Sequence, residues 1–237
     1  MDIRLDKYIS DFTELTRSEA KKAIRDGRVR VNGETARKPN AKLSFSDSVF
    51  MGEEEVVGER YQYIMFNKPA GVVSATVDRD ETTVVECVRS RSPRHLAKDL
   101  FPMGRLDKDT RGLLVLTNDG DMAHRLLSPA RHVPKKYYVV LDVEINSTDV
   151  EQMRSGLDIG EKHLTKPAHM EIISGNECFL TITEGKYHQI KRMFRCLGKT
   201  VVGLKRVEMA GLKLDESLAE GEWRFLTEEE IEYLKTL

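Results

Sequence analysis

Apolar residues recur at helical spacing in several short stretches of the chain. Within residues 187–197 they fall at Ile190, Met193, Phe194 and Leu197, the i, i+3, i+4, i+7 pattern of a helix with one buried face. Gly198 is expected to end that helix. With capping patterns at 16–19, 118–120 and 227–230, the same spacing predicts further short helices over residues 4–12, 17–26, 120–127 and 147–155 and from residue 228 onward.

Other stretches have the alternating or continuous apolar pattern of strands. These are residues 28–31, 61–67, 112–117, 137–144, 170–173, 178–183, 200–209 and 222–226. Turn residues at Asn32-Gly33 and at 174–176 predict hairpins. Hairpins mixed with scattered helices favour an α+β fold over a repeating βαβ fold.

The charged residues divide the chain into two bodies. The net charge is −1 overall, but it is +3 over residues 1–50, −4 over 51–59, +6 over 60–214 and −6 over 215–237. Basic bodies suit a polyanionic partner, whereas the balanced total argues against simple electrostatic coating of nucleic acid. Because the acidic stretch 52–59 separates the bodies, we expect it to be a linker, with one domain over residues 1–58 and another over 59–237.

Composition disfavours several other classes of protein. The three cysteines and six histidines show neither disulfide nor metal-ligand spacing, so no metal site is expected. The longest aliphatic run, residues 113–116, is too short to cross a membrane, and the first residues have no secretory pattern. We therefore expect a cytoplasmic protein with no membrane partner.

The first 50 residues resemble the S4 RNA-binding domain. The matching segments are RLDKYI, TRSEAKKAIRDGRVRVNG and KPNAKL, in that order. A basic helix followed by a basic hairpin offers phosphate contacts along one face. The resemblance implies a small α/β module that binds RNA through Arg4, Arg17, Lys21, Lys22, Arg25, Arg28 and Arg30.

From residue 63 onward the chain resembles the RsuA branch of the pseudouridine synthases. Four segments match its motifs in order: NKPAGVVS (67–74), GRLDKDTRGLLVLTNDG (104–120), KKYYVVL (135–141) and EGKYHQIKRMF (184–194). Two more, LTKPA (164–168) and LAEGEWRFLTEEEI (218–231), look like the small-subunit rRNA enzyme. The resemblance implies a catalytic domain on a mixed, mostly antiparallel sheet with flanking helices. It also implies isomerisation of a uridine to pseudouridine in 16S ribosomal RNA, expected at about position 516 by family resemblance.

The implied reaction breaks the N1–C1′ bond and forms a C5–C1′ bond without redox change or net hydrolysis, so no cofactor is expected. Asp107 is the expected nucleophile, because a carboxylate is ionised at neutral pH and can form a covalent adduct. A buried carboxylate needs a cation beside it, and the resemblance supplies Lys191. The resemblance implies that Tyr137 stacks on the uracil and takes part in proton removal, whereas Tyr138 would point to the opposite face of its strand. Asp109 fits a helper or turn residue.

Further residues are expected to hold the RNA. Arg105 could enter the duplex or bind a phosphate as the target base leaves the stack, and Gly185 permits close backbone approach. The expected substrate contacts are Arg105, Lys68, Gly185, Lys186, His188, Gln189 and Arg192. The expected partner is 16S ribosomal RNA or a small-subunit assembly intermediate, bound by a monomer.

Three other functions remain to be weighed. DKDT at 107–110 suggests an aspartyl phosphatase, but that chemistry needs the threonine one position later and the apolar strand before the aspartates. An S4 module alone fits a non-enzymatic rRNA-binding or ribosome-assembly factor, which has no use for Asp107, Tyr137 and Lys191 together. A large-subunit (23S) rRNA synthase of the same branch shares every catalytic motif, and motif spacing does not fix the target uridine.

Overall fold

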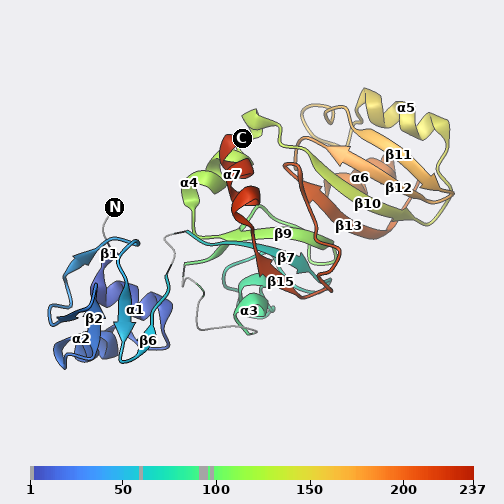
Figure 1. Ribbon diagram of the computed structural model, residues 1–237. Coiled ribbons are helices and arrows are strands. Elements are labelled where there is room, and N and C mark those ends of the chain that lie inside the picture. The colour runs from blue at the N-terminus through green and yellow to red at the C-terminus, as the bar shows by residue number, and fades with distance from the viewer. Residues whose placement is uncertain (1–2, 59–60, 91–95, 97–98) are drawn as a thin grey trace. The chain divides into compact units, whose positions relative to one another are not determined.

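The structure is a computed structural model that describes residues 3–58, 61–90, 96 and 99–237. The chain forms two compact units (Figure 1). One comprises Met1–Gln62 with Arg89–Leu100, and the other comprises Tyr63–Val88 with Phe101–Leu237.

The N-terminal unit packs two helices, α1 (Leu5–Phe12) and α2 (Arg17–Arg25), against short strands. The predicted capping box is confirmed: Thr16 Oγ1 accepts from the Glu19 amide, and Glu19 Oε2 accepts from the Thr16 amide at 2.8 Å. The strands are β1 (Ile3–Arg4), β2 (Val29–Val31), β3 (Glu34–Ala36), β4 (Lys42–Leu43), β5 (Val49–Met51) and β6 (Glu54–Glu55). They form a sheet of order β3–β2–β5–β6 and a separate β1–β4 pair.

The predicted linker over 52–59 is wrong in its first part. Glu54–Glu55 form β6, which pairs with β5 as a hairpin, and Val56 is buried in the core of the unit. Strands of two or three residues are too short for an alternating pattern to show, so the acidic run concealed the hairpin. Residue 59 lies outside the described residues.

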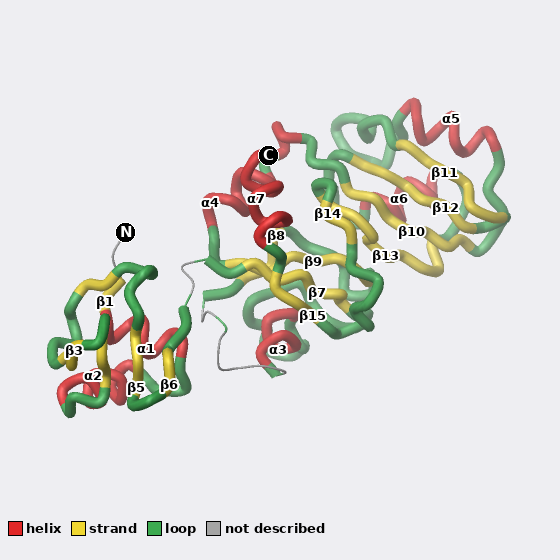
Figure 2. Tube along the Cα trace, viewed as in Figure 1, coloured by secondary structure: helices red, strands yellow, loops and turns green. Residues whose placement is uncertain are grey.

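The second unit is built on one long mixed sheet, whose strands are yellow in Figure 2. The strand order is β11–β12–β10–β13–β9–β7–β15, with β8 paired to β9 and β14 to β13. Every described pair is antiparallel except β13 with β9, which confirms the predicted fold class. The strands are β7 (Tyr63–Lys68), β8 (Phe101–Met103), β9 (Arg111–Thr117), β10 (Lys135–Leu141), β11 (His169–Ser174), β12 (Glu177–Ile182), β13 (Val201–Met209), β14 (Leu212–Lys213) and β15 (Trp223–Phe225).

Short capped helices flank this sheet. The Asp119 side chain accepts from the Met122 amide at the start of α4, and Thr227 caps α7, as the sequence predicts. Helix α5 packs beside β11 at the edge of the sheet (Figure 1). The helices are α3 (Val84–Arg89), α4 (Gly120–Leu127), α5 (Ser147–Ser155), α6 (Gln189–Cys196) and α7 (Glu228–Thr236), with a 3-10 turn at η2 (Pro129–Arg131).

Several predicted elements have different ends in the structure, and β10 and α6 show the physical reason. Strand β10 stops at Leu141 rather than at residue 144, because the chain turns away where the Asp142 amide donates to the Thr200 carbonyl. Helix α6 begins at Gln189 rather than at residue 187, because His188 has a left-handed backbone with φ 47°. The apolar spacing located the buried face of α6 but not its first turn.

Gly112 lets the two halves of the sheet meet. It has φ +98°, and a Cβ at this position would collide with the backbone carbonyl oxygen of Arg206. Gly112 and Arg206 are paired neighbours in the single parallel contact of the described sheet, β9 with β13. Glycine is required here both for the backbone conformation and for the close approach.

Candidate active site

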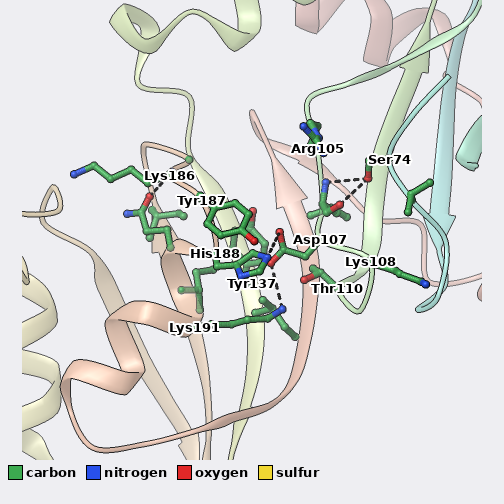
Figure 3. Close-up of a pocket in the computed structure, with 17 residues that line it drawn as sticks. Ser74, Arg105, Asp107, Lys108, Thr110, Tyr137, Lys186, Tyr187, His188 and Lys191 are labelled. Atoms are coloured by element: carbon green, nitrogen blue, oxygen red, sulfur yellow. Dashed lines mark hydrogen bonds and ion pairs between the residues drawn. The ribbon is translucent and has the colours of Figure 1, made fainter. Parts of the chain in front are cut away.

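A cavity of about 500 Å³ opens beside the loop between β8 and β9. Tyr137, Ile182 and Leu204 contribute from β10, β12 and β13, and the strand register places their side chains on one face of the sheet. Tyr138 lies on the opposite face, where its ring meets Phe179 edge-on. The remaining lining residues are Val73, Ser74, Arg105, Leu106, Asp107, Lys108, Thr110, Gly185, Lys186, Tyr187, His188, Gln189, Ile190 and Lys191 (Figure 3).

The loop that carries Asp107 is held by hydrogen bonds to its backbone. Ser74 Oγ donates to the Leu106 carbonyl at 2.8 Å and accepts from the Leu106 amide at 3.0 Å. The Thr110 amide donates to the Asp107 carbonyl at 3.1 Å, which closes a turn around the carboxylate. These contacts fix the backbone on both sides of Asp107, so its side chain is presented from a rigid support.

Lys68 supports the same loop from beneath. It is wholly buried, and its Nζ donates to the carbonyls of Pro69, Lys108 and Thr110 at 3.0, 3.2 and 2.8 Å. Burial lowers the pKa of Lys68 to about 8, although the charges of Asp109 and Asp107 act to raise it. Lys68 is not among the residues that line the cavity. Lys68 was expected to contact the substrate, but in the structure it positions the loop that carries Asp107.

Asp107 and Lys191 meet inside the cavity. Lys191 Nζ lies 3.2 Å from Asp107 Oδ2 (Figure 3) and 2.6 Å from Asp109 Oδ1, so it bridges two carboxylates. The side chains of Lys191 and Asp107 are 22% and 31% exposed, whereas that of Asp109 is 70% exposed. The shorter contact is thus made to the more solvated carboxylate, and the contact with Asp107 is the better shielded one.

The bridge shifts two ionisation equilibria. Burial acts to lower the pKa of Lys191, but the hydrogen bond to Asp109 and the charge of Asp107 outweigh it and hold the pKa above its ordinary value. Burial acts to raise the pKa of Asp109, but the hydrogen bond from Lys191 and its charge outweigh it and hold that pKa low. Both groups are therefore charged at neutral pH.

Two rings lie beside the carboxylate. His188 Nε2 is 3.7 Å from Asp107 Oδ1, and the ring of Tyr187 stacks on that of His188 with centroids 3.8 Å apart (Figure 3). Arg105 lines the same cavity, is exposed, and has no ion-pair partner among the residues that the structure describes. These side chains leave the approach to Asp107 basic and aromatic, which suits a nucleotide.

Three of the expected substrate contacts are used within the protein. Gln189 is buried and bonds Glu184 and the Lys186 amide, which shapes the loop before α6. The amine of Lys186 donates to the His163 carbonyl at 3.1 Å. Arg192 is not in the cavity: its guanidinium bonds Glu161 at 2.7 Å and also the Ile159 carbonyl.

Gly185 lines the cavity, and a Cβ there would meet nothing within 4 Å.

The basic residues of the N-terminal unit fall into two groups. Arg4 and Arg17 both pair with Asp6, which is wholly buried, at 2.9 and 3.2 Å. Arg30 bonds the Gly52 carbonyl at 3.0 Å. The others have no ion-pair partner in the described part of the chain: Lys21, Lys22, Arg25 and Arg28. This second group keeps its charges available for phosphates.

Sequence reasoning missed two residues of this site. Ser74 closes the motif NKPAGVVS, but nothing in the pattern showed that its hydroxyl would hold the Asp107 loop. Tyr187 was placed inside a helix, whereas it lies in the loop before α6. The signal that was available is the Gly185–Lys186 pair, which could have indicated a loop before the helix.

The described residues contain no group of three or more side chains suited to a metal ion. None of the described helices is long and apolar enough to cross a membrane.

Comparison with known families decides between the remaining classes of protein. The RNA pseudouridylate synthase family matches residues 62–195, and the S4 domain family matches residues 3–49. The chain belongs to the RNA pseudouridine synthases. The match covers the Asp107 loop, Tyr137 and Lys191, so this synthase is an enzyme and neither an aspartyl phosphatase nor a non-enzymatic assembly factor.

Relatives extend the similarity over nearly the whole synthase. An uncharacterized RNA pseudouridine synthase of Bacillus subtilis is 44% identical over 98% of both chains. The ribosomal small subunit pseudouridine synthase A of Haemophilus influenzae is 43% identical, over 98% of this chain and 99% of its own. A crystal structure of a pseudouridylate synthase is 43% identical, covers 98% of this chain and 99% of its own, and superposes with a TM-score of 0.69.

Proposed function

We propose that this synthase isomerises one uridine of 16S ribosomal RNA to pseudouridine, with Asp107 as the nucleophile. The observation that carries the choice of RNA is the 43% identity to a small-subunit synthase over 98% of this chain, both domains included. The Asp107–Lys191 pair beside Tyr137 supports the assignment of the nucleophile. The substrate would be free 16S RNA or an assembly intermediate of the small subunit, bound by a monomer in the cytoplasm.

The reaction rearranges one nucleotide without any other reactant. The N1–C1′ bond breaks, the uracil turns within the cavity, the C5–C1′ bond forms, and the proton on C5 leaves while N1 regains one. Asp107 would form a covalent adduct with the base or the sugar, which divides one difficult step into two. Lys191 would keep that carboxylate anionic before the attack and neutralise it when the adduct breaks.

Tyr137 would hold the detached uracil. Its ring contributes to the cavity wall together with Ile182 and Leu204, an apolar surface on which a planar base can pack while it turns. Its hydroxyl would take part in removal of the C5 proton. Arg105, whose guanidinium has no ion-pair partner among the described residues, would bind phosphate or occupy the space that the extruded base leaves.

The test is tritium release from 16S transcripts labelled at C5 of uracil, followed by mapping of the modified position. Wild type should release one tritium per transcript, from about position 516 by family resemblance, and Asp107→Asn should bind the transcript but release none. Asp109→Asn is the matched control, because it removes a carboxylate from the same lysine and should turn over. Turnover by Asp107→Asn would overturn the assignment of Asp107 as the nucleophile. Release from 23S but not 16S transcripts would assign the synthase to large-subunit RNA.

A further inference from the structure

Tyr187 presents an open aromatic face at the mouth of the cavity. The residue is 75% exposed although it lines the cavity. One face of its ring is covered by His188, at 3.8 Å between centroids and 18° between planes. The exposed area must therefore belong to the other face and the ring edge. A large aromatic surface left in water beside a nucleophile is a ready stacking site for a base.

The backbone holds this ring pair in place before any RNA binds. The Tyr187 carbonyl accepts from Arg192 at 3.1 Å, and the Arg192 amide donates to the His188 carbonyl at 3.0 Å. His188 adopts a left-handed backbone with φ 47° and ψ 34°, a conformation that a residue with a side chain keeps only when its surroundings hold it there. Strain that is kept beside the nucleophile indicates that the direction of the ring matters.

The order of the rings determines which base can stack there. The imidazole of His188 lies next to Asp107, 3.7 Å away, and Tyr187 lies on the imidazole. A base on the free face of Tyr187 would have the tyrosine ring between it and the imidazole that contacts Asp107. That position suits the base of a neighbouring nucleotide better than the uracil that reacts with Asp107.

We propose that Tyr187, supported by His188, is a stacking platform for a base flanking the target uridine. The platform would fix the strand while the target nucleotide enters the cavity, and it would be a determinant of RNA recognition rather than of the chemical step. This inference rests on the proposed action on RNA but does not depend on which ribosomal RNA is the substrate.

The direct test uses fluorescence of 2-aminopurine, placed in turn at the two positions that flank the target uridine in a 16S fragment. Binding of wild type should change the stacking-sensitive fluorescence at one of the two positions. Tyr187→Phe keeps the ring and should keep the signal, whereas Tyr187→Ala should lose it. Tyr233→Ala, which removes an exposed tyrosine of α7 outside the cavity, is the matched control and should behave as wild type.

A second measurement links the platform to turnover. Tyr187→Ala should reduce kcat/KM by about tenfold, mostly through KM, since stacking on an aromatic ring commonly contributes about fivefold to a hundredfold in affinity per base. An abasic residue at the same flanking position should cause a similar loss in wild type and little further loss in Tyr187→Ala. His188→Asn tolerates the left-handed backbone and should weaken the signal by removing the supporting ring.

The outcomes separate this inference from the proposed function. Equal fluorescence changes in wild type and Tyr187→Ala at both positions, or fully additive losses with the abasic RNA, would overturn the platform. If the fragment binds but wild type forms no pseudouridine in it, the choice of substrate fails while the fluorescence comparison still decides for or against the platform.

Discussion

Replacing Lys191 by methionine would keep the length of the side chain and remove its charge. Lys191 Nζ lies 3.2 Å from Asp107 Oδ2, and at that distance two unit charges interact by about 1.3 kcal/mol in water and about 5 kcal/mol at an effective dielectric constant of ~20. The two side chains are 22% and 31% exposed, so solvent screens the pair. We therefore expect Lys191→Met to remove about 1–2 kcal/mol of stabilisation of the Asp107 anion, a value close to the figure for water.

This loss has a defined signature in the pH–rate profile. Since 1.36 kcal/mol corresponds to one pH unit, the acid limb of single-turnover tritium release should move upward by about one unit in Lys191→Met. Lys191→Arg keeps the charge and should retain part of the activity and the position of the limb. Asp109→Asn leaves the Lys191–Asp107 contact intact and should also leave the limb in place.

If Lys191→Met left the rate and the pH–rate profile unchanged, Lys191 would not be the group that keeps the Asp107 carboxylate anionic. The next residue to test would then be His188, whose Nε2 is 3.7 Å from Asp107. Arg192 is excluded as a substitute in this conformation, because its guanidinium is bonded to Glu161 and to the Ile159 carbonyl.

Three further predictions concern stability and RNA affinity. Gly112→Ala forces β9 away from the Arg206 carbonyl and should lower the free energy of unfolding by about 3 kcal/mol or more, measured by urea titration. Burial lowers the pKa values of Lys135 and Lys68 to about 8, so unfolding takes up protons between about pH 8 and 10.5 and stability should rise with pH there, each lysine contributing at most about 1.4 kcal/mol per unit. Lys135→Met should remove its share of that rise, and an equal slope in both proteins would contradict it. The triple variant Lys21→Ala, Lys22→Ala, Arg25→Ala removes three basic residues of α2. It should reduce the slope of log affinity for RNA against log salt concentration by about two to three, and an unchanged slope would place the RNA on another surface.

The sequence was sufficient for elements whose signal is local. The capping box at Thr16 needs only residues three apart, and the Asp119 cap precedes its helix directly, so both could be predicted and both are confirmed. The α+β class followed from hairpins mixed with short helices. The short strands β1, β4, β5 and β6 were missed because each has three residues or fewer, too few for a periodicity.

The candidate site shows the same division between local and long-range information. Motif resemblance gave Asp107, Tyr137 and Lys191, and the strand period separated Tyr137 from Tyr138. It could not show that Lys191 makes its shorter contact with Asp109, because that choice depends on how α6 meets a loop 82 residues away. For the same reason Lys68 was expected at the substrate, whereas it is wholly buried.

The first and second motifs of the synthase form one physical unit through Lys68. A buried ammonium without a directly bonded carboxylate is costly, and the lowered pKa of about 8 reflects that cost. Three carbonyls, two of them from the Asp107 loop, satisfy its three donors. The lysine thereby holds the loop through its backbone and makes no bond to the Asp107 carboxylate, which meets Lys191 instead. A second ammonium bonded to that carboxylate would have immobilised it and consumed the oxygen that must react.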